Sequence, residues 1–432
     1  MEVEKNFLWT QFPDEIVENH EDELIDILKK DIELAQDSVK MITSFDREVT
    51  DYLRSRDWII QNCDNCFKEF FSKNNSSTFC PNCRASDEFI SFEGRKRLID
   101  DEILADNFRS FFSSLKYIGQ NSIPMIPKFG QTLFTIAGVQ IINPHLFADE
   151  PLINEQTFIL QPSIRLQTMD DTKSYCGCST AFVNSVTIQP VSIISDHLVH
   201  FDHWLDFLTD LGFQKKYLGV KFRYGAQNWG LGNFINMNID VYYGGLSLFN
   251  ASFFYKMPTV SKVPINVSDM GITIERTLWM LNKTSSYFDI IGPYEMALSG
   301  KNNEIDAIRT MVLMMGSGVI GNSKSGKERM RSKKIRCFAR KISRLNGQIN
   351  VGRAVDYFYD YWNKYIDFPV QKFDVVRAIQ KEHQIAVNQE ILEILGSSKM
   401  SQNIELDTHI FIKKLIDERI ATREQIEKIF IY

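Results

Sequence analysis

The hydrophobic and polar positions along the chain predict helix at the start, strands in the middle and helix at the end. Apolar residues near the N-terminus recur at the spacing of one helix face: Ile16, Leu24, Ile25, Ile27 and Leu28. The middle carries β-rich runs, among them TFILQPSIRLQ and FINMNIDVYYGGLSLFNASFFY. Helical patterns such as VVRAIQKEHQIAVNQEILEIL follow. We therefore expect an α+β protein whose mainly antiparallel sheet is flanked by helices.

The composition is that of a soluble globular protein with several parts. Of the 432 residues, 44% are hydrophobic and 24% are charged, which suits two or three domains. No stretch reaches the roughly 18 apolar residues of a membrane span, and the first residues lack the pattern of a signal peptide, so we expect a cytoplasmic protein. The patterns predict four parts: an acidic helical extension over 1–55, a small cysteine module over 56–95, a sheet domain over 96–298 and a helical domain over 299–432.

Four of the seven cysteines form two closely spaced pairs. Cys63 and Cys66 make the first pair, and Cys80 and Cys83 the second. This spacing is typical of a zinc ribbon, in which four thiolates hold one tetrahedral ion and leave no position for water, so the zinc would be structural. The alternative is two surface hairpins that merely contain cysteine. The other three cysteines are expected not to bind metal: Cys176, Cys178 and Cys337.

The charge is segregated along the chain. A net charge of -6 gives no overall attraction for nucleic acid. The segment from Lys324 to Arg344, however, gathers ten Lys and Arg residues with Glu328 as its single acidic residue. Such a run is often a solvated helix face, but the mutual repulsion of its cations favours a polyanion lying alongside.

One segment, DMGITIERTLWML, suggests chemistry. It resembles motif 3 of class II aminoacyl-tRNA synthetases, in which a strand-to-helix corner aims an Arg at the γ-phosphate of ATP. Arg276 takes that position here, and Glu275 precedes it. A guanidinium suits the task because it binds phosphate through two parallel hydrogen bonds. Taken alone, an exposed Glu-Arg at a helix start is the more common explanation of such a segment.

Further segments follow the order of archaeal-type alanyl-tRNA synthetases. LADNFRSFFSSLKYIGQNSIP resembles the motif 1 region, and FILQPSIRLQTM resembles the motif 2 strand, which ends in an Arg on the α-phosphate, here Arg165. WGLGNFINMNIDVYYGG resembles a Gly-rich turn followed by strands, with Asp240 where the family has a Glu near ATP and Mg²⁺. The resemblance runs from about residue 56 to the C-terminus. It implies a class II catalytic domain over 96–298 and a tRNA-recognition domain over 299–432.

The resemblance also implies a set of site residues. Arg165 and Arg276 would be catalytic. The residues implied at ATP and Mg²⁺ are Arg165, Phe182, Asp240, Glu275 and Arg276, and those implied at the amino acid are Asn233, Asn250, Asp269 and Gly271. Asp269 would bind the substrate ammonium, although Asp before Gly is also common in turns. Phe182 would stack on adenine or belong to the core, and Asn250 would line the pocket or end a strand.

The helical half resembles the part of the family that binds the tRNA acceptor stem. The residues implied there are Asn322, Lys327, Arg329, Arg336, Arg340 and Asp417. The resemblance ends before the editing domain of the family, so we expect no hydrolytic correction in cis. A small apolar pocket separates substrates that differ by one methylene by only about 1–3 kcal/mol, so an alanine enzyme without editing would be error-prone.

The sequence departs from the family at several positions. In motif 2, CGCST replaces the Arg-His after the loop of the family, and Phe182-Val183 replaces its Phe-Glu pair on the returning strand. In motif 3, Thr273 stands in place of a Gly and adds a side chain where ATP packs closely. We expect activation of alanine or another small amino acid with ATP and Mg²⁺, and its transfer to tRNA. The alternatives are an inactive paralogue that binds tRNA or has a regulatory role, and a generic zinc-ribbon nucleic-acid binder.

Overall fold

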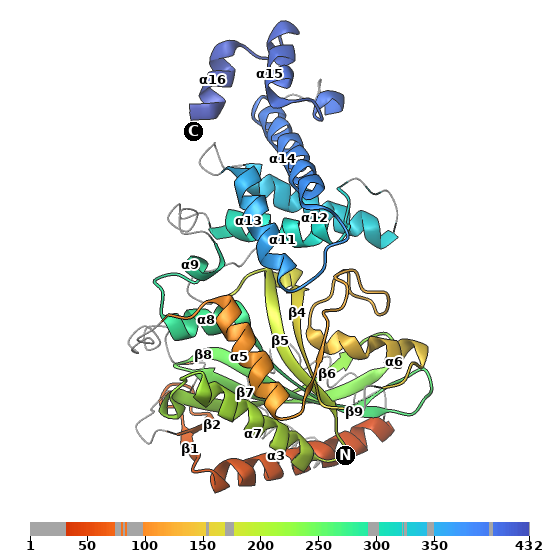
Figure 1. Ribbon diagram of the computed structural model, residues 1–432, viewed down its shortest axis with the longest axis vertical. Coiled ribbons are helices and arrows are strands. Elements are labelled where there is room, and N and C mark those ends of the chain that lie inside the picture. Colours follow the sequence, from red (N-terminus) through yellow and green to blue (C-terminus); the bar gives the residue numbers. More distant parts are fainter. Residues whose placement is uncertain are drawn as a thin grey trace.

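The structure is a computed structural model that describes residues 32–73, 79–80, 83, 98–152, 155–168, 177–292, 302–321, 323, 326–343, 350–396 and 401–431. In this part of the chain a nine-stranded sheet is surmounted by a stack of helices (Figure 1). The predicted antiparallel-dominated sheet with flanking helices is thereby confirmed. Within these ranges no helix combines the length and the hydropathy that a membrane span requires.

The sheet has the strand order β1-β2-β6-β7-β8-β9-β5-β4-β3. Neighbouring strands are antiparallel except β3 and β4, which are parallel. The strands are β1 Ile59–Asn62, β2 Glu69–Ser72, β3 Ile118–Gln120, β4 Thr157–Ile164, β5 Ala181–Pro190, β6 Leu218–Asn228, β7 Asn233–Tyr243, β8 Leu246–Met257 and β9 Ile265–Thr273. Because residues paired across antiparallel strands share a face, polar positions from several strands come together on one side of the sheet.

Three helices cover one face of the sheet: α3 Ile32–Ser55, α5 Asp101–Ser114 and α7 Ile194–Asp210 (Figure 1). Fully buried aromatic side chains fill the space between these helices and the strands, among them Phe45, Phe108 and Trp204. The start of α5 is capped by Asp100, whose carboxylate accepts a hydrogen bond of 2.8 Å from the Ile103 amide. This face is therefore closed by the main core.

The opposite face is only partly covered. The short helices η1 Gly138–Ile142 and α6 Asn143–Ala148 lie over one end of it. They enclose a smaller apolar cluster that includes Ile159, Val186 and Phe254. The rest of this face borders an open cleft, which is described below.

The described region after the sheet is helical. Its helices are α8 Ile274–Asn282, α9 Phe288–Ile291, α11 Asn302–Gly316, α12 Gly326–Ser343, α13 Val351–Asn363, α14 Lys372–Ile394, α15 Thr408–Asp417 and α16 Arg423–Ile431. Three short 3-10 turns complete the described elements: η2 Leu166–Thr168, η3 Lys215–Tyr217 and η4 Ser401–Asn403. Helix α11 is buried along most of its length and contacts α12, α13 and α14. Helices α15 and α16 form a separate apolar cluster at the end of α14 (Figure 1).

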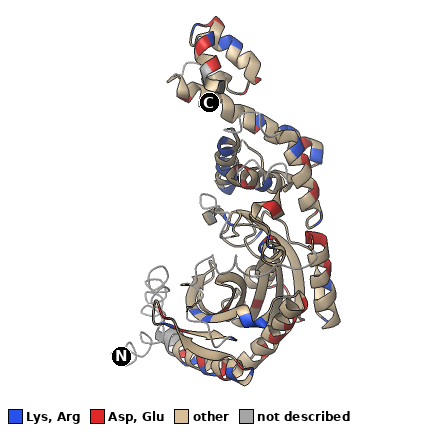
Figure 2. Ribbon diagram, turned by 90° about the vertical axis from the view of Figure 1, so that its left-hand side faces the viewer, with Lys and Arg blue, Asp and Glu red and all other residues tan. Residues whose placement is uncertain are grey.

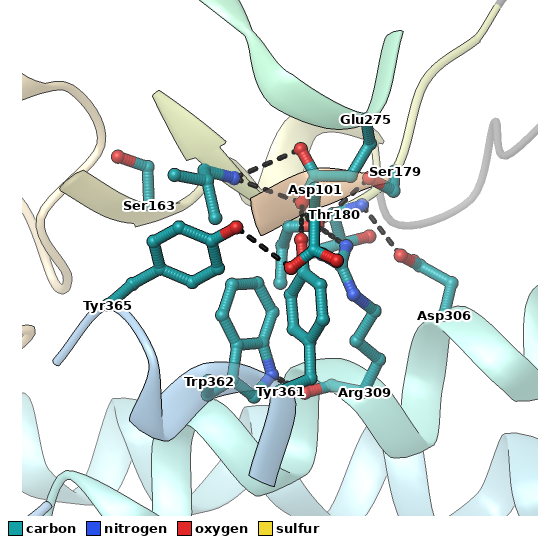
Figure 3. Close-up of polar contacts among 12 residues, drawn as sticks. Asp101, Ser163, Ser179, Thr180, Glu275, Asp306, Arg309, Tyr361, Trp362 and Tyr365 are labelled. Atoms are coloured by element: carbon teal, nitrogen blue, oxygen red, sulfur yellow. Dashed lines mark hydrogen bonds and ion pairs between the residues drawn. The ribbon is translucent and has the colours of Figure 1, made fainter. Parts of the chain in front are cut away.

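A buried polar junction joins the helical region to the sheet (Figure 3). Glu275 at the start of α8 forms an ion pair with Arg309 of α11, and both side chains are excluded from solvent. The Glu275 carboxylate also accepts hydrogen bonds from the Tyr361 hydroxyl at 2.9 Å and from the Val183 amide at 3.1 Å. Asp306 accepts a hydrogen bond of 2.8 Å from the main chain just before β5. Helices α11 and α13 therefore hold both the start of β5 and the start of α8.

The predicted boundaries at residues 55, 95 and 298 stay predictions, but the packing across the first two is continuous. Helix α3, expected in the N-terminal extension, contributes Phe45, Val49 and Leu53 to the main core. The strands β1 and β2 of the cysteine module extend the main sheet, because Phe71 pairs with Val220 of β6. The acidic residues expected before residue 32 lie outside the described residues.

Candidate functional site

A cleft of about 1020 Å³ opens on the partly covered face of the sheet. Its floor is formed by residues of β5, β6, β7, β8 and β9, and its rim by the loop over 130–132 and by η1. This volume is at the upper end of the range for small-molecule sites. Of the residues predicted to act together, those that line the cleft are Arg165, Asp240, Asn250, Asp269, Gly271 and Arg276. Their roles stay predictions, but the fold brings these six positions to one place.

Arg165 and Arg276 reach the cleft from separate elements. Arg165 follows β4, and its Nε donates to the Ile136 carbonyl at 3.1 Å. Arg276 lies in the first turn of α8, directly after β9, as expected for a strand-to-helix corner. Reduced hydration within the cleft, and next the positive charge of Arg276, lower the pKa of Arg165. The two guanidinium groups thus repel each other across the cleft, which favours an anion between them.

The Arg276 side chain is held in a single direction. Its Nε donates to the Gly177 carbonyl at 2.8 Å and its Nη1 to the Ser247 carbonyl at 3.2 Å. Its Nη2 lies 2.8 Å from the Cys178 sulfur. Gly177 has a φ of +61°, and a Cβ there would lie 2.8 Å from the Trp279 ring, so this close approach requires glycine. The main chain before β5 therefore orients the guanidinium.

Asp269 lies at the bottom of the cleft. Burial raises the pKa of this carboxyl to about 7, against the lowering effect of Arg165. Its buried Oδ1 has no hydrogen-bond partner among the residues that the structure describes. A buried acceptor without a partner is costly, so the position favours a ligand that donates hydrogen bonds or carries positive charge. An ammonium group has both properties.

Asp240 is in the cleft but already has a cationic partner. Arg223 of β6 donates to the Asp240 carboxylate through Nε at 2.8 Å and through Nη2 at 3.3 Å. The amide of Asn250 also donates to this carboxylate. Mg²⁺ sites in proteins commonly use one or two carboxylates together with the phosphates of the substrate. The cleft residues do not fit a preformed Mg²⁺ site, because Asp240 is paired with Arg223 and Asp269 lies near Arg165.

Two further predicted positions lie near the cleft, and Gly271 lies on its floor. Phe182 is buried on β5, with the Arg165 guanidinium 5.0 Å above its ring. Asn233 starts β7 beside the cleft, where its side chain accepts a hydrogen bond of 2.9 Å from Asn228. At Gly271 a Cβ would lie 2.4 Å from the Val186 side chain, so this floor position admits only glycine. Neither Phe182 nor Asn233 is among the residues that line the cleft.

The expectation that Glu275 binds ATP or Mg²⁺ is corrected by the structure. Its side chain is 1% exposed and contacts Arg309, Tyr361 and β5 rather than the cleft (Figure 3). Consecutive residues in the first turn of a helix point about 100° apart, so Glu275 and Arg276 cannot both face the cleft. Glu275 instead anchors the helix start that presents Arg276.

The basic run forms helix α12, and part of it lines a second hollow. This groove, of about 590 Å³, lies between α12 and α14. Four cations line it at the spacing of one helix face: Arg329, Lys333, Arg336 and Arg340. Figure 2 shows Lys and Arg gathered on the helices at mid-height, above the sheet. A phosphate backbone could follow this row, although the weak Arg340–Glu393 pair at 3.8 Å offsets some of its charge.

The remaining residues predicted to bind tRNA are distributed differently. Lys327 donates to the Gly130 carbonyl at 2.9 Å and so reaches the rim of the cleft. Asp417 is exposed at the end of α15 and does not line the basic groove. Asn322 lies outside the described residues. Arg331, counted with the basic run, is buried against Glu328 and the Leu133 carbonyl and therefore has a structural role.

The four cysteines of the two pairs converge, and they could hold a metal ion. The sulfurs of Cys63, Cys66, Cys80 and Cys83 all lie within 4.8 Å of one another. The sulfurs of Cys66 and Cys80 are 3.7 Å apart. Zn–S bonds of about 2.3 Å at tetrahedral angles place sulfurs about 3.8 Å apart, so the cluster fits zinc. Cys178 and Cys337 lie elsewhere, and Cys176 is outside the described residues.

Several residues of the cleft and its support were not singled out from the sequence. Arg223 lies in an alternating strand pattern, KFRYG, which predicts the face of the sheet on which its side chain lies but not its pairing with Asp240. Gly177 and Arg309 belong to segments whose roles depend on contacts between distant parts of the chain. The polar floor residues Asn238 and Ser252 could have been found from their alternation with apolar residues on β7 and β8.

Comparison with known proteins agrees with the predicted resemblance. No family model matches the chain. Over 240 residues it is 23% identical to the alanine–tRNA ligase of Saccharolobus islandicus strain M.14.25, covering 53% of this chain and 26% of that protein. Over 305 residues it is 22% identical to the alanine–tRNA ligase of Thermococcus kodakarensis, covering 63% of this chain and 32% of that protein.

A solved structure of a pyrrolysyl tRNA synthetase from Desulfitobacterium hafniense overlaps 44% of this chain and 71% of its own, at 13% identity and a TM-score of 0.29. The chain spans about a quarter to a third of the length of the curated relatives it matches. In sequence, it is similar to the archaeal alanine–tRNA ligases over about half of its length.

Proposed function

We propose that this protein activates alanine or another small amino acid with ATP and transfers it to tRNA. The observation that carries the proposal is the convergence of Arg165, Arg276 and Asp269 on one cleft. Two guanidinium groups suit a triphosphate, and a buried carboxylate with an unpartnered oxygen suits an ammonium group. A cleft that takes both ligands brings an amino-acid carboxylate close to a phosphate.

The chemistry would proceed in two displacements. A carboxylate oxygen of the amino acid attacks the α-phosphorus of ATP, the bond to the β-phosphate oxygen breaks, and pyrophosphate leaves. Arg165 would stabilise charge at the α-phosphate and Arg276 at the γ-phosphate, while Asp269 holds the ammonium. A terminal hydroxyl of tRNA then attacks the carbonyl carbon, and AMP leaves. Mg²⁺ would arrive bound to the triphosphate and neutralise part of its charge.

The basic groove supplies the second half of the proposal. Arg329, Arg336 and Arg340 line it, and α12 contacts the cleft rim through Lys327. A tRNA acceptor stem along α12 would therefore have its end directed toward the cleft. The acidic net charge of the chain makes such a localised basic surface the place where a polyanion would bind.

Exchange of labelled pyrophosphate into ATP, tested with each amino acid in turn, examines this function. We expect exchange that depends on a small amino acid and on Mg²⁺. The Arg276→Ala variant should lose exchange while keeping its zinc content. Absence of exchange by the wild-type protein with every amino acid would contradict the proposed activation.

A non-catalytic tRNA-binding protein is the second candidate. It is favoured by the contacts of Arg276 with the Gly177 and Ser247 carbonyls, which already accept two of the hydrogen bonds that the guanidinium can donate. The lack of a Glu at Val183 on the returning strand favours it too. This candidate predicts salt-sensitive tRNA binding without ATP binding.

A further inference from the structure

A row of polar side chains crosses the floor of the cleft from Asp269. Ser252 on β8 pairs directly with Asp269 on β9, and Asn238 on β7 pairs with Ser252. Arg223 on β6 pairs with Asn238 and continues the row. All four residues line the cleft. Side chains paired across antiparallel strands lie about 4.5–5.5 Å apart at Cβ, so a ligand held at Asp269 meets Ser252 next.

The row is hydrogen-bonded, yet it keeps free capacity toward the cleft. The Ser252 hydroxyl lies 2.7 Å from the Asn238 side-chain oxygen and 2.5 Å from that of Asn250, so its single proton is donated to one of them and its lone pairs stay able to accept. Arg223 uses Nε and Nη2 for Asp240, while its Nη1 has no partner among the residues described here. The Arg223 side chain is 41% exposed. A ligand can therefore find both donors and acceptors along this row.

The direction of a bound amino acid follows from its charges. Its ammonium belongs at the unpartnered Asp269 oxygen, and its carboxylate belongs toward the guanidinium of Arg165. At Gly271, the next cleft-facing position of β9, no side chain projects from the floor. The Val186 side chain fills the space that a Cβ at this position would take. The amino-acid side chain is then left to extend over Ser252 and Asn238. Its chemistry must match theirs.

We infer that the amino acid taken by this cleft carries a small hydroxyl or carboxamide side chain, and that Ser252 determines the preference over alanine. The inference rests on the proposed function, because it assumes an ammonium at Asp269. A methyl or larger alkyl group would remove water from Ser252 without replacing the hydrogen bonds of that water. A hydroxyl or carboxamide group replaces them, and sites built for hydrogen bonds discriminate strongly against ligands that lack them.

The test compares ligands of equal shape on the full-length protein. Serine is compared with 2-aminobutyrate and alanine, and asparagine with leucine, by isothermal titration calorimetry in the presence of ATP and Mg²⁺. The same ligands are tested in pyrophosphate exchange. We expect serine or asparagine to be preferred over its apolar counterpart by at least about tenfold. Equal or better binding of alanine or 2-aminobutyrate overturns the inference.

Variants locate the preference at Ser252. Ser252→Val should reduce the ratio of serine to 2-aminobutyrate by about tenfold, whereas Ser261→Val on the exposed loop should leave it unchanged. If Ser252→Val does not fold, as judged by its melting temperature, the ligand series on the wild-type protein still tests whether a hydroxyl or carboxamide side chain is preferred.

The calorimetry and the exchange separate this inference from the proposed function. Serine binding without exchange would remove the activation claim and keep the inference. Exchange that prefers alanine would keep activation and overturn the inference. Absence of binding by every ligand in the series also overturns the inference, while the exchange assay decides on activation.

Discussion

Arg165 and Arg276 enter the same cleft, one after β4 and the other at the start of α8, directly after β9, and β5 lies between β4 and β9 in the sheet. Reduced hydration, and after it repulsion by Arg276, lowers the pKa of Arg165. Proteins place like charges close together at a cost, and an anionic ligand between them relieves it. The pair is therefore the centre of the proposed nucleotide site, and Asp269 beside it is the centre of the amino-acid site.

Amino-acid binding is expected to weaken as the pH falls through about 7, where burial places the pKa of Asp269. The ionised carboxylate holds the ammonium, so affinity should fall about tenfold between pH 8 and pH 6. Calorimetric titration of the preferred amino acid measures this. Asp269→Asn has nearly the same shape and should bind weakly at both pH values. A wild-type affinity that stays constant from pH 8 to pH 6 would contradict the assignment.

The same carboxyl should affect folding stability in the opposite sense. Its folded pKa of about 7 is above the value of about 3.9 for an exposed aspartate. The folded state holds the proton more tightly, so this group makes the fold less stable as the pH rises from about 4 to about 7. Relative to wild type, Asp269→Asn should gain stability across that window, as followed by urea unfolding at each pH.

The buried Glu275–Arg309 pair gives a prediction about folding. Arg309→Met leaves the Glu275 carboxylate buried without its cation and should lower the free energy of unfolding by about 3–5 kcal/mol. Arg377→Met, at an exposed position of α14, is the control and should change the free energy of unfolding by less than about 0.5 kcal/mol. Thermal and urea unfolding of both variants measure the difference. Similar stability for the two would mean that the junction is not held by this pair.

The cysteine cluster predicts one zinc ion per chain. Cys63→Ser or Cys80→Ser should remove the metal and destabilise the β1–β2 edge of the sheet, because thiolates supply every ligand. Cys337→Ser on α12 is the matched control and should keep full zinc content. Elemental analysis of protein purified without chelator gives the content directly. Zinc-free wild-type protein that is folded would be incompatible with a structural zinc.

The groove between α12 and α14 predicts how tRNA binding depends on salt. Arg329→Ala and Arg336→Ala should each weaken binding and reduce the salt slope by about one, because each removes a phosphate contact. Lys372→Ala, whose amine is paired with Asp356 and Asp360, should leave both quantities unchanged. Filter binding of tRNA over a range of salt concentrations tests this. Unchanged slopes in the arginine variants would place tRNA elsewhere.

The sequence predicted those features that depend on local pattern and motif order. The β-rich runs predicted the sheet, and the resemblance to motif 3 implied the strand-to-helix corner. The sequence around Glu275 does not show that its side chain points away from the cleft. That direction depends on the ion pair with Arg309, which lies in the distant apolar run DAIRTMVLMM. The packing of α3 onto the sheet was missed for a similar reason: its apolar stripe shows that a face is buried but not what covers it.

The central claim is that Arg165 and Arg276 bind the same triphosphate. Measuring the binding of ATP to variants tests this claim most directly. Calorimetry should show ATP binding to the wild-type protein and a loss of at least about tenfold in Arg165→Ala and in Arg276→Ala, since each removes charge-assisted hydrogen bonds. Arg109→Ala, at an exposed pair with Asp106, should bind ATP as the wild type does. Equal ATP affinity in all four proteins would contradict the account.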